Sequence, residues 1–309
     1  MSSRSAGLAA LVATIWGLCF VLIQASLPSP APLLLAALRA LIGGGILAAW
    51  IALRRWWPGT RRREAGLAVP HPWRTGLPSI PRLVALALTN AVLAFGAMYL
   101  AAGRAEAAVA SILAAGQPLI LAAAGWALFS EQASMRTVTG LAVAMAGVVL
   151  VATTSSGATS TDGVALSLLA TAAPAAGTVL MRRIAPTVDV LLTTSAQFLV
   201  GGAILVAMSA LLEPWGALSW SPETLTGLLV LGVLGTGLAY VAWFWLLDRV
   251  SLVRLGAALF LVPVTGVVAA ILIGDRPAPV ELAGIAAVLV GVGIVSVASA
   301  PQPSEGATR

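Results

Sequence analysis

The side chains best suited to binding chemistry lie in two lines of sequence that nearly repeat each other. "LRALIGGGILAA" covers residues 38–49 and "AQFLVGGAILVA" covers 196–207, with Arg39 in the first and Gln197 in the second. A guanidinium offers five donors in a fixed fork that can hold a carboxylate through two hydrogen bonds. Arg39 is therefore a candidate anchor for a carboxylate, and Gln197 is a candidate contact at the equivalent place. The alternative for Arg39 is a side chain that extends to an aqueous interface or bonds carbonyls at a neighbouring helix end.

A second group of candidates shares one face of the first apolar segment. Trp16, Phe20 and Gln24 recur at every fourth residue, which is the spacing of neighbours on a helix. Such a stripe is typical of packing, but an amide finds no hydrogen-bond partner in lipid. Gln24 therefore favours a face that lines a cavity.

Two aromatic faces are predicted further along the chain. Each has the spacing i, i+3, i+4, which brings three side chains to one side of a helix. Their members are Phe95, Met98 and Tyr99 in one face, and Tyr240, Trp243 and Phe244 in the other. Two such faces can clamp a flat apolar ligand. Core packing, or an aromatic belt at a membrane surface, is the alternative.

Two amides, Asn90 and Gln117, complete the candidate contacts, and both stand within apolar segments. Gln117 precedes Pro118, whose missing N–H leaves a carbonyl free in the preceding turn. This arrangement predicts either a gating hinge or an acceptor for a ligand. Both interpretations put it near the path of that ligand.

No catalytic, metal-binding or cofactor-binding site is predicted. The chain has one histidine and one cysteine, and its carboxylates form no pair at a usable spacing. All 17 basic residues are arginine, which excludes a phosphate-binding loop or a Schiff base that needs lysine. No carboxylate falls near the middle of an apolar segment, so a proton relay there is not expected. We expect neither an enzyme nor an ATP-driven pump.

The composition indicates which elements must hold these residues. Of the 309 residues, 60% are hydrophobic and 9% are charged, whereas a soluble chain is about a quarter charged. Apolar runs long enough to cross a hydrocarbon core of about 30 Å as helices recur along the chain. We therefore predict an all-α integral membrane protein. Its ten transmembrane helices have these approximate limits: 7–26, 33–53, 82–102, 106–129, 136–153, 163–182, 189–212, 223–247, 252–273 and 280–299.

The arginines predict the orientation. When the loops are assigned to alternate sides, 14 arginines fall on the side of the N-terminus and two on the other. Basic residues concentrate on the cytoplasmic side, so both termini should be cytoplasmic in a cytoplasmic (inner) membrane. The long basic loop 54–81 is expected to contact anionic lipid headgroups. The net charge of +6 is then a topology signal, and we expect no nucleic-acid partner.

The repeated lines belong to an internal repeat. A shift of 158 residues aligns Arg39 with Gln197, and a shift of 145 aligns the two aromatic faces. The predicted repeats are 7–153 and 163–299, with five helices each. Because five is an odd number, the second repeat enters the membrane from the opposite side. Inverted repeats of this kind place a substrate site near the midplane, between the two halves.

The chain resembles the EamA family of the drug/metabolite transporter superfamily over nearly its whole length. The resemblance lies in an ordered set of short motifs: Trp16-Gly17, Arg39, Pro118, Glu131, Gly140, Gly147, and the weaker second-half set Pro263, Asp275 and Gly284. It implies a bundle of ten helices in two inverted repeats that exports amino acids or other small metabolites. The second half has Pro174 where the first has Trp16, so the two sides of the cavity should differ chemically.

The expected function is secondary transport of a small-molecule substrate by alternating access. Neutral or aromatic amino acids lead because of the paired aromatic faces, and other drugs or metabolites are an alternative. A non-transporting structural or sensory membrane protein is a second alternative. An enzyme acting on lipid would need a polar cluster with a nucleophile or metal ligands, which the sequence does not show. We expect a monomer or a homodimer.

Overall fold

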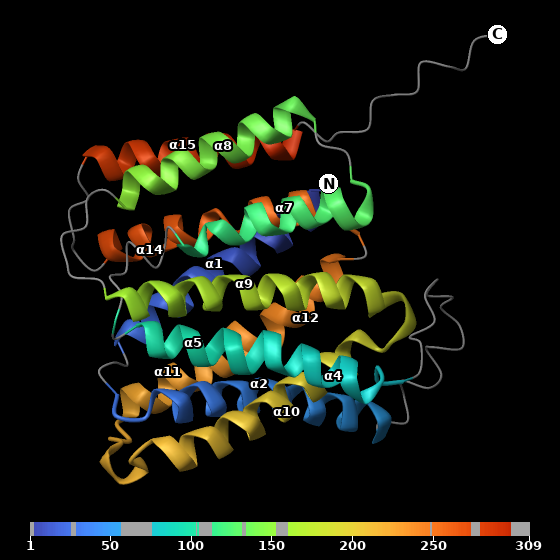
Figure 1. The fold of residues 1–309 in the computed structure, drawn as a ribbon, viewed down its shortest axis with the longest axis vertical. Helices are drawn as coiled ribbons and strands as arrows, with labels where there is room; N and C mark the ends of the chain where they lie inside the picture. The colour runs from blue at the N-terminus through green and yellow to red at the C-terminus, as the bar shows by residue number, and fades with distance from the viewer. Residues whose placement is uncertain are drawn as a thin grey trace.

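The computed structural model describes a bundle of roughly parallel helices (Figure 1). It covers residues 3–25, 29–56, 76–102, 104, 113–131, 134–152, 160–247, 249–272 and 279–297. All regular secondary structure in these ranges is helical. Residues 57–75, which make up most of the predicted basic loop 54–81, lie outside the described part.

Ten helical segments cross the bundle within the described residues, some of them divided into shorter elements. Five are long and apolar enough to span a membrane, and five are shorter apolar helices. The segments are α1 (Ser3–Ala25), α2 (Pro32–Trp56), α4–η1–α5 (Ile80–Ala87, Leu88–Leu93, Ala94–Ala101), α7 (Gly116–Phe129), α8 (Met135–Ala152), α9 (Thr161–Ile184), α10 (Val190–Leu212), α11–η4–α12 (Pro222–Gly232, Val233–Leu238, Ala239–Leu247), α13–α14 (Leu252–Ala258, Leu261–Leu272) and α15 (Pro279–Val297).

Several helices begin where a short polar side chain replaces a missing backbone partner. Ser160, Asp189, Ser221 and Ser251 precede α9, α10, α11 and α13, and each accepts a hydrogen bond from an N–H of the first turn. Capping of this kind satisfies one of the donors that a helix start leaves free. The polar residues between the apolar runs thus determine where these spans begin.

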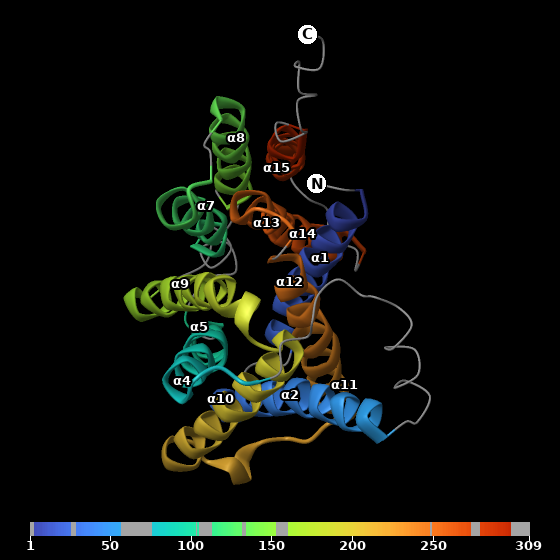
Figure 2. The ribbon, with the colours of Figure 1, turned by 90° about the vertical axis from the view of Figure 1, so that its right-hand side faces the viewer.

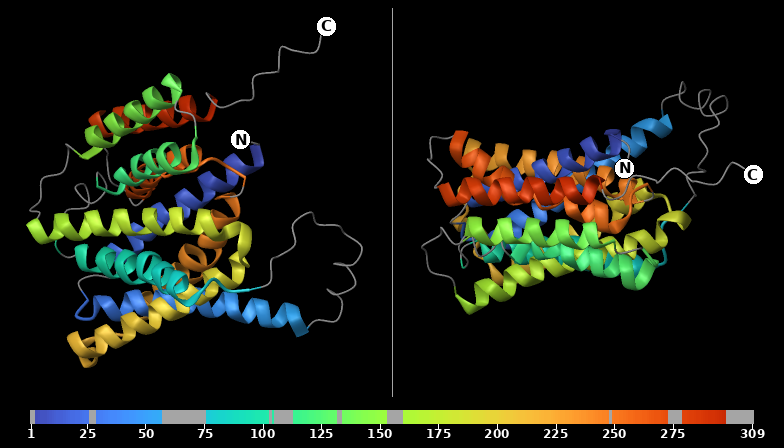
Figure 3. Two further views of the ribbon diagram at one scale, coloured as in Figure 1. Left: turned by 45° about the vertical axis from the view of Figure 1, so that its right-hand side comes forward. Right: turned by 90° about the horizontal axis from the view of Figure 1, so that it is seen from above.

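The two halves are inverted with respect to each other. The first helix of each half, α1 and α9, crosses the bundle in opposite directions, as do the second helices α2 and α10 (Figure 1). The end-on view shows how the halves interlock (Figure 2). Equivalent helices pack on each other: α2 on α10, α8 on α15, and α7 on α13. The start of α1 and the end of α15 lie at the same end of the bundle (Figure 3). The expected all-α fold of inverted five-helix repeats is confirmed.

Both halves contain a π-helical segment in the third helix, which the sequence did not indicate. The segments are η1 (Leu88–Leu93) and η4 (Val233–Leu238). They are 145 residues apart, the shift that also aligns the aromatic faces. A π-turn bonds residue i to i+5, so one carbonyl and one side chain are redirected relative to an α-helix. The two segments carry Asn90 and Thr236, whose contacts with Gln197 and Arg39 are described below.

The fourth helix of each half is interrupted just before its proline. α7 begins at Gly116, two residues before Pro118. In the second half α13 ends at Ala258 and α14 begins at Leu261, two residues before Pro263. Proline has no N–H for the preceding turn, which explains a break at this place.

Candidate functional site

A cavity lies between the two halves in the middle of the bundle. Its volume is about 1140 Å³, a figure that includes the space at its opening. Six of the residues that the sequence singled out line it: Trp16, Arg39, Phe95, Met98, Gln117 and Tyr240. The lining continues to Ala101 and Ala114, at the end of the bundle where α5 ends and α7 begins (Figure 1). We call this the α5–α7 end.

Arg39 is the charged group of the cavity wall. Its side chain is only 2% exposed, so it points between the helices and not toward lipid headgroups. Nε donates to the Thr236 hydroxyl at 2.9 Å, and Nη1 lies 3.7 Å from the Met98 sulfur. The guanidinium carbon is 4.2 Å from the centre of the Phe95 ring. Within the described residues no carboxylate is in ion-pair contact with Arg39, so its charge is balanced only by dipoles and a ring face.

The π-segment η4 holds both Arg39 and Trp16. The Thr236 hydroxyl that accepts from Arg39 donates in turn to the Leu231 carbonyl, at 3.0 Å. The indole Nε1 of Trp16 donates to the Gly235 carbonyl at 2.9 Å. Both Thr236 and Gly235 lie in the π-segment, where bonding from i to i+5 redirects side chains and carbonyls relative to an α-helix.

Aromatic rings pack at the base of the cavity. The Trp16 ring centre lies 5.2 Å from that of Tyr240 and 5.0 Å from that of Trp243. Phe198 stands edge-on to Tyr240 at 4.7 Å and is stacked on Phe95 at 5.6 Å. The two predicted aromatic faces meet where Phe95 stands edge-on to Tyr240 at 6.2 Å. Phe95, Tyr240 and Trp16 line the cavity and offer a ligand an apolar floor.

Hydroxyl groups on α9 form the opposite wall. Ser167 donates to the Gly163 carbonyl and Thr171 donates to the Ser167 carbonyl, both at 2.8 Å. Each hydroxyl proton is thus used within the helix, and the oxygen keeps its lone pairs for a donor in the cavity. Together with Thr178 these residues line the cavity.

Two predicted contacts, Asn90 and Gln197, bond each other instead of lining the cavity. Asn90 Nδ2 donates to Gln197 Oε1 at 3.1 Å, and both residues are fully buried. Gly177 of α9 makes room for this pair, because a Cβ there would meet the Asn90 side chain. We do not retain Asn90 and Gln197 as proposed substrate contacts.

The remaining predicted contacts are divided between packing positions and undescribed side chains. Trp243 is fully buried and donates to the Thr178 hydroxyl at 3.2 Å. Tyr99 is 2% exposed. Neither is part of the cavity wall. The side chains of Phe20 and Gln24 lie outside the described part of the structure.

Sequence reasoning missed several cavity residues: Cys19, Ser167, Thr171 and Thr178. A signal existed for those on α9, because Ser167, Thr171, Pro174 and Thr178 follow helical spacing along one face. Cys19 gave none, because a buried thiol is also a common packing residue.

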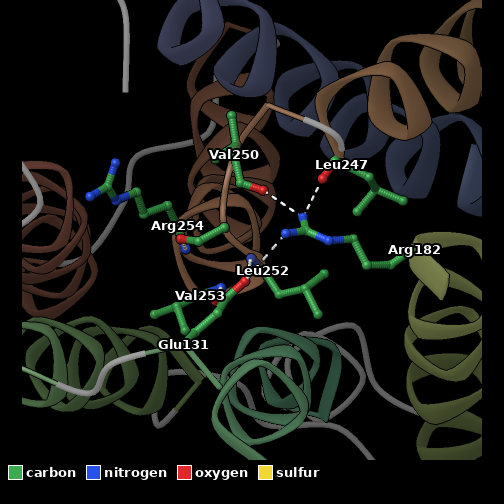
Figure 4. Close-up of polar contacts among 8 residues, drawn as sticks. Glu131, Arg182, Leu247, Val250, Leu252, Val253 and Arg254 are labelled. Carbon is green, nitrogen blue, oxygen red and sulfur yellow. Dashed lines mark hydrogen bonds and ion pairs between the residues drawn. The ribbon is translucent and has the colours of Figure 1, made fainter. Parts of the chain in front are cut away.

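The end of the bundle opposite the α5–α7 end is tied together by one arginine (Figure 4). Arg182, near the end of α9, donates to the carbonyls of Leu247 and Val250 in the turn after α12. Its Nη2 is 3.7 Å from Oε1 of Glu131, just after α7. The Glu131 carboxylate accepts from the N–H groups of Leu252 and Val253, at 2.8 and 3.1 Å, and so caps α13. We call these six residues the Arg182 network.

A ten-segment helical bundle of inverted halves around a central cavity is the architecture of a multi-pass membrane transporter. The profile of the EamA-like transporter family matches residues 4–153 and again 161–297. The chain belongs to this family.

Similarity extends to named relatives along most of the chain. The uncharacterized transporter YvbV of Bacillus subtilis is 26% identical over 97% of this chain and 94% of its own length. A probable amino-acid metabolite efflux pump of Salmonella typhimurium is 28% identical over 94% of both chains. A solved crystal structure superposes with a TM-score of 0.77 at 19% identity, covering 97% of this chain and 98% of that one. The last likeness concerns the fold alone. The protein is a membrane transporter of small metabolites and not an enzyme.

Proposed function

We propose that the protein exports small metabolites that carry a carboxylate, with neutral and aromatic amino acids as the leading class. The observation that carries this proposal is Arg39, a buried guanidinium in the cavity wall with no carboxylate in contact among the described residues. Burying such a charge costs several kcal/mol unless it is paired. A substrate carboxylate would supply the missing pair.

The rest of the cavity suits the remainder of an amino acid. The ring floor of Trp16 and Tyr240 accepts an apolar or aromatic side chain. The hydroxyl oxygens of Ser167 and Thr171 and the amide of Gln117 accept hydrogen bonds from an ammonium group. Two relatives, in Salmonella typhimurium and Escherichia coli, are named as probable amino-acid metabolite efflux pumps, which supports the same class of substrate.

Transport is proposed to proceed by alternating access. The cavity extends to the α5–α7 end, while the Arg182 network ties the opposite end. The arginine distribution favours a cytoplasmic location for the Arg182 end, in the cytoplasmic membrane, with anionic lipid near the basic loop. The conformation described here would then face outward, and substrate entry would require the Arg182 network to separate.

Purified protein in proteoliposomes tests the proposal with three compounds of matched shape. L-Phenylalanine, 3-phenylpropionate and phenethylamine share one ring but differ in charge. We expect counterflow of the first two without an imposed pH gradient, and none of the amine. Transport of phenethylamine as fast as phenylalanine would contradict the role of Arg39. A complete absence of flux for amino acids and other carboxylates would favour the structural or sensory alternative.

A further inference from the structure

The two halves meet at two interfaces that the repeat makes equivalent. At one, Arg39 of α2 bonds Thr236 of η4. At the other, Gln197 of α10 bonds Asn90 of η1. Arg39 and Gln197 are related by the 158-residue shift, and η1 and η4 by the 145-residue shift. Under the same shifts Asn90 corresponds to Gly235.

At each interface a side chain fills the space beside the polar pair. It comes from the π-segment at one interface and from the first helix of a half at the other. At the Gln197 interface the side chain comes from η1: Asn90 covers Gly177, which has none. At the Arg39 interface the arrangement is exchanged. Gly235 of η4 has no side chain, and Cys19, the equivalent of Gly177 in α1, takes the space. A Cβ added at Gly235 would meet the Cys19 sulfur.

The exchange leaves a smaller side chain beside Arg39, whose side-chain hydrogen bonds within the described residues come from Nε and Nη1. A thiol is smaller than a carboxamide, and it is a weak hydrogen-bond acceptor. The Cβ position of Gly235 lies 3.6 Å from Nη2 of Arg39, so a carboxamide at that position would reach the guanidinium. Arg39 and Cys19 line the cavity, whereas Asn90 and Gln197 do not.

We propose that Gly235 and Cys19 are specificity-determining residues, which keep the place beside Arg39 vacant for the carboxylate of the substrate. The planar carboxylate of the substrate would lie beside Arg39 in the place that corresponds to the planar carboxamide of Asn90 at the Gln197 interface. The inference rests on the proposed function, since it assumes that Arg39 binds the substrate carboxylate. It adds that the vacancy exists at one interface only, so the cavity has a single anion site.

Two variants that differ only in a carboxamide test this proposal. Both carry Cys19→Ala, which removes the sulfur that would collide with a new Cβ. One adds Gly235→Ala and the other adds Gly235→Asn. The alanine variant is the reference for the binding of L-phenylalanine and 3-phenylpropionate. The asparagine variant should bind them about tenfold or more weakly, because its carboxamide occupies the Arg39 donors.

A second measurement separates this inference from the proposed function. Without any ligand, the asparagine variant in detergent should unfold at a higher temperature than the alanine variant, because the buried guanidinium gains an acceptor. If the wild type binds neither probe, the proposed carboxylate specificity is wrong, and the unfolding comparison alone decides about the vacancy. Equal binding by the two variants, an equal loss in both, or no gain in unfolding temperature would overturn the proposal.

Discussion

At the scale of single residues, the free-energy cost of burying the Arg39 charge supports a role for this residue in binding. A guanidinium with 2% exposure has lost its hydration, and the Thr236 hydroxyl with the Phe95 ring replaces only part of it. The equivalent residue in the other half is the neutral Gln197. The fold therefore does not need a charge at this place, which supports the proposed role of Arg39 in ligand binding.

Arg39→Gln copies the other half and should fold, while it lowers the transport of carboxylate-bearing substrates by about ten- to a hundredfold, the loss of one charge-assisted contact. Arg39→Lys should restore transport only in part, because an ammonium cannot form the two parallel hydrogen bonds of a guanidinium. Initial rates of phenylalanine counterflow measure both. Normal rates for Arg39→Gln would show that the arginine is structural.

The same residues show how much of the candidate site can be predicted from the sequence. Arg39 could be found because a charge in an apolar helix must have a reason. Asn90 and Gln197 meet that criterion equally well, but Asn90 Nδ2 donates to Gln197 Oε1, and Asn90 Oδ1 and Gln197 Nε2 have no partner among the described residues. Whether a buried polar group turns to a neighbour or to a cavity depends on contacts between helices far apart in the chain, and periodicity carries no such information.

At the scale of elements, apolar runs and breakers predicted the spans well, since burial in lipid is read directly from composition. Glycines in the sequence also explain how α8 and α15 pack together. A Cβ added at Gly147 of α8 would lie 2.5 Å from the Gly284 carbonyl of α15, and one at Gly291 would lie 2.5 Å from the Gly140 carbonyl. Small residues of this kind let helix backbones approach closely in membranes.

Gly147→Ala should therefore force α8 and α15 apart and lower the free energy of unfolding by about 1–3 kcal/mol, the usual cost of overpacking. The matched control is Gly293→Ala on α15, where an added Cβ meets no atom within 4 Å. Thermal unfolding in detergent compares the two. An unchanged unfolding temperature for Gly147→Ala would contradict the tight packing of this pair.

At the scale of the whole molecule, the Arg182 network joins α9 to the residue after α7 and to the turn between α12 and α13 (Figure 4), and we propose that it acts as a gate. Arg182→Gln removes the ion pair and both carbonyl contacts. We expect this change to shift the equilibrium toward the state open at the Arg182 end by about five- to tenfold, since such equilibria differ by only a few kcal/mol.

Cys19 is the single cysteine of the chain and lines the cavity. Its reaction with a thiol reagent therefore measures the change in this conformational equilibrium. A small membrane-impermeant thiol reagent should reach it mainly from the α5–α7 side in the wild type, and more from the Arg182 side in the variant. Arg183→Gln is the control, because it removes an exposed charge one residue further along α9. Equal labelling patterns in both variants would show that the Arg182 network is not a gate.

The paired π-segments carry information about descent. A π-turn accommodates one residue more than an α-turn, so each segment amounts to a one-residue insertion in its helix. The two insertions occupy the same place in both halves, at Leu88–Leu93 and Val233–Leu238. The simplest history places one insertion in an ancestral five-helix unit, before that unit was duplicated and inverted. On that history the side chains around it diverged, giving Asn90 in one copy and Gly235 in the other, while both copies kept the distorted backbone.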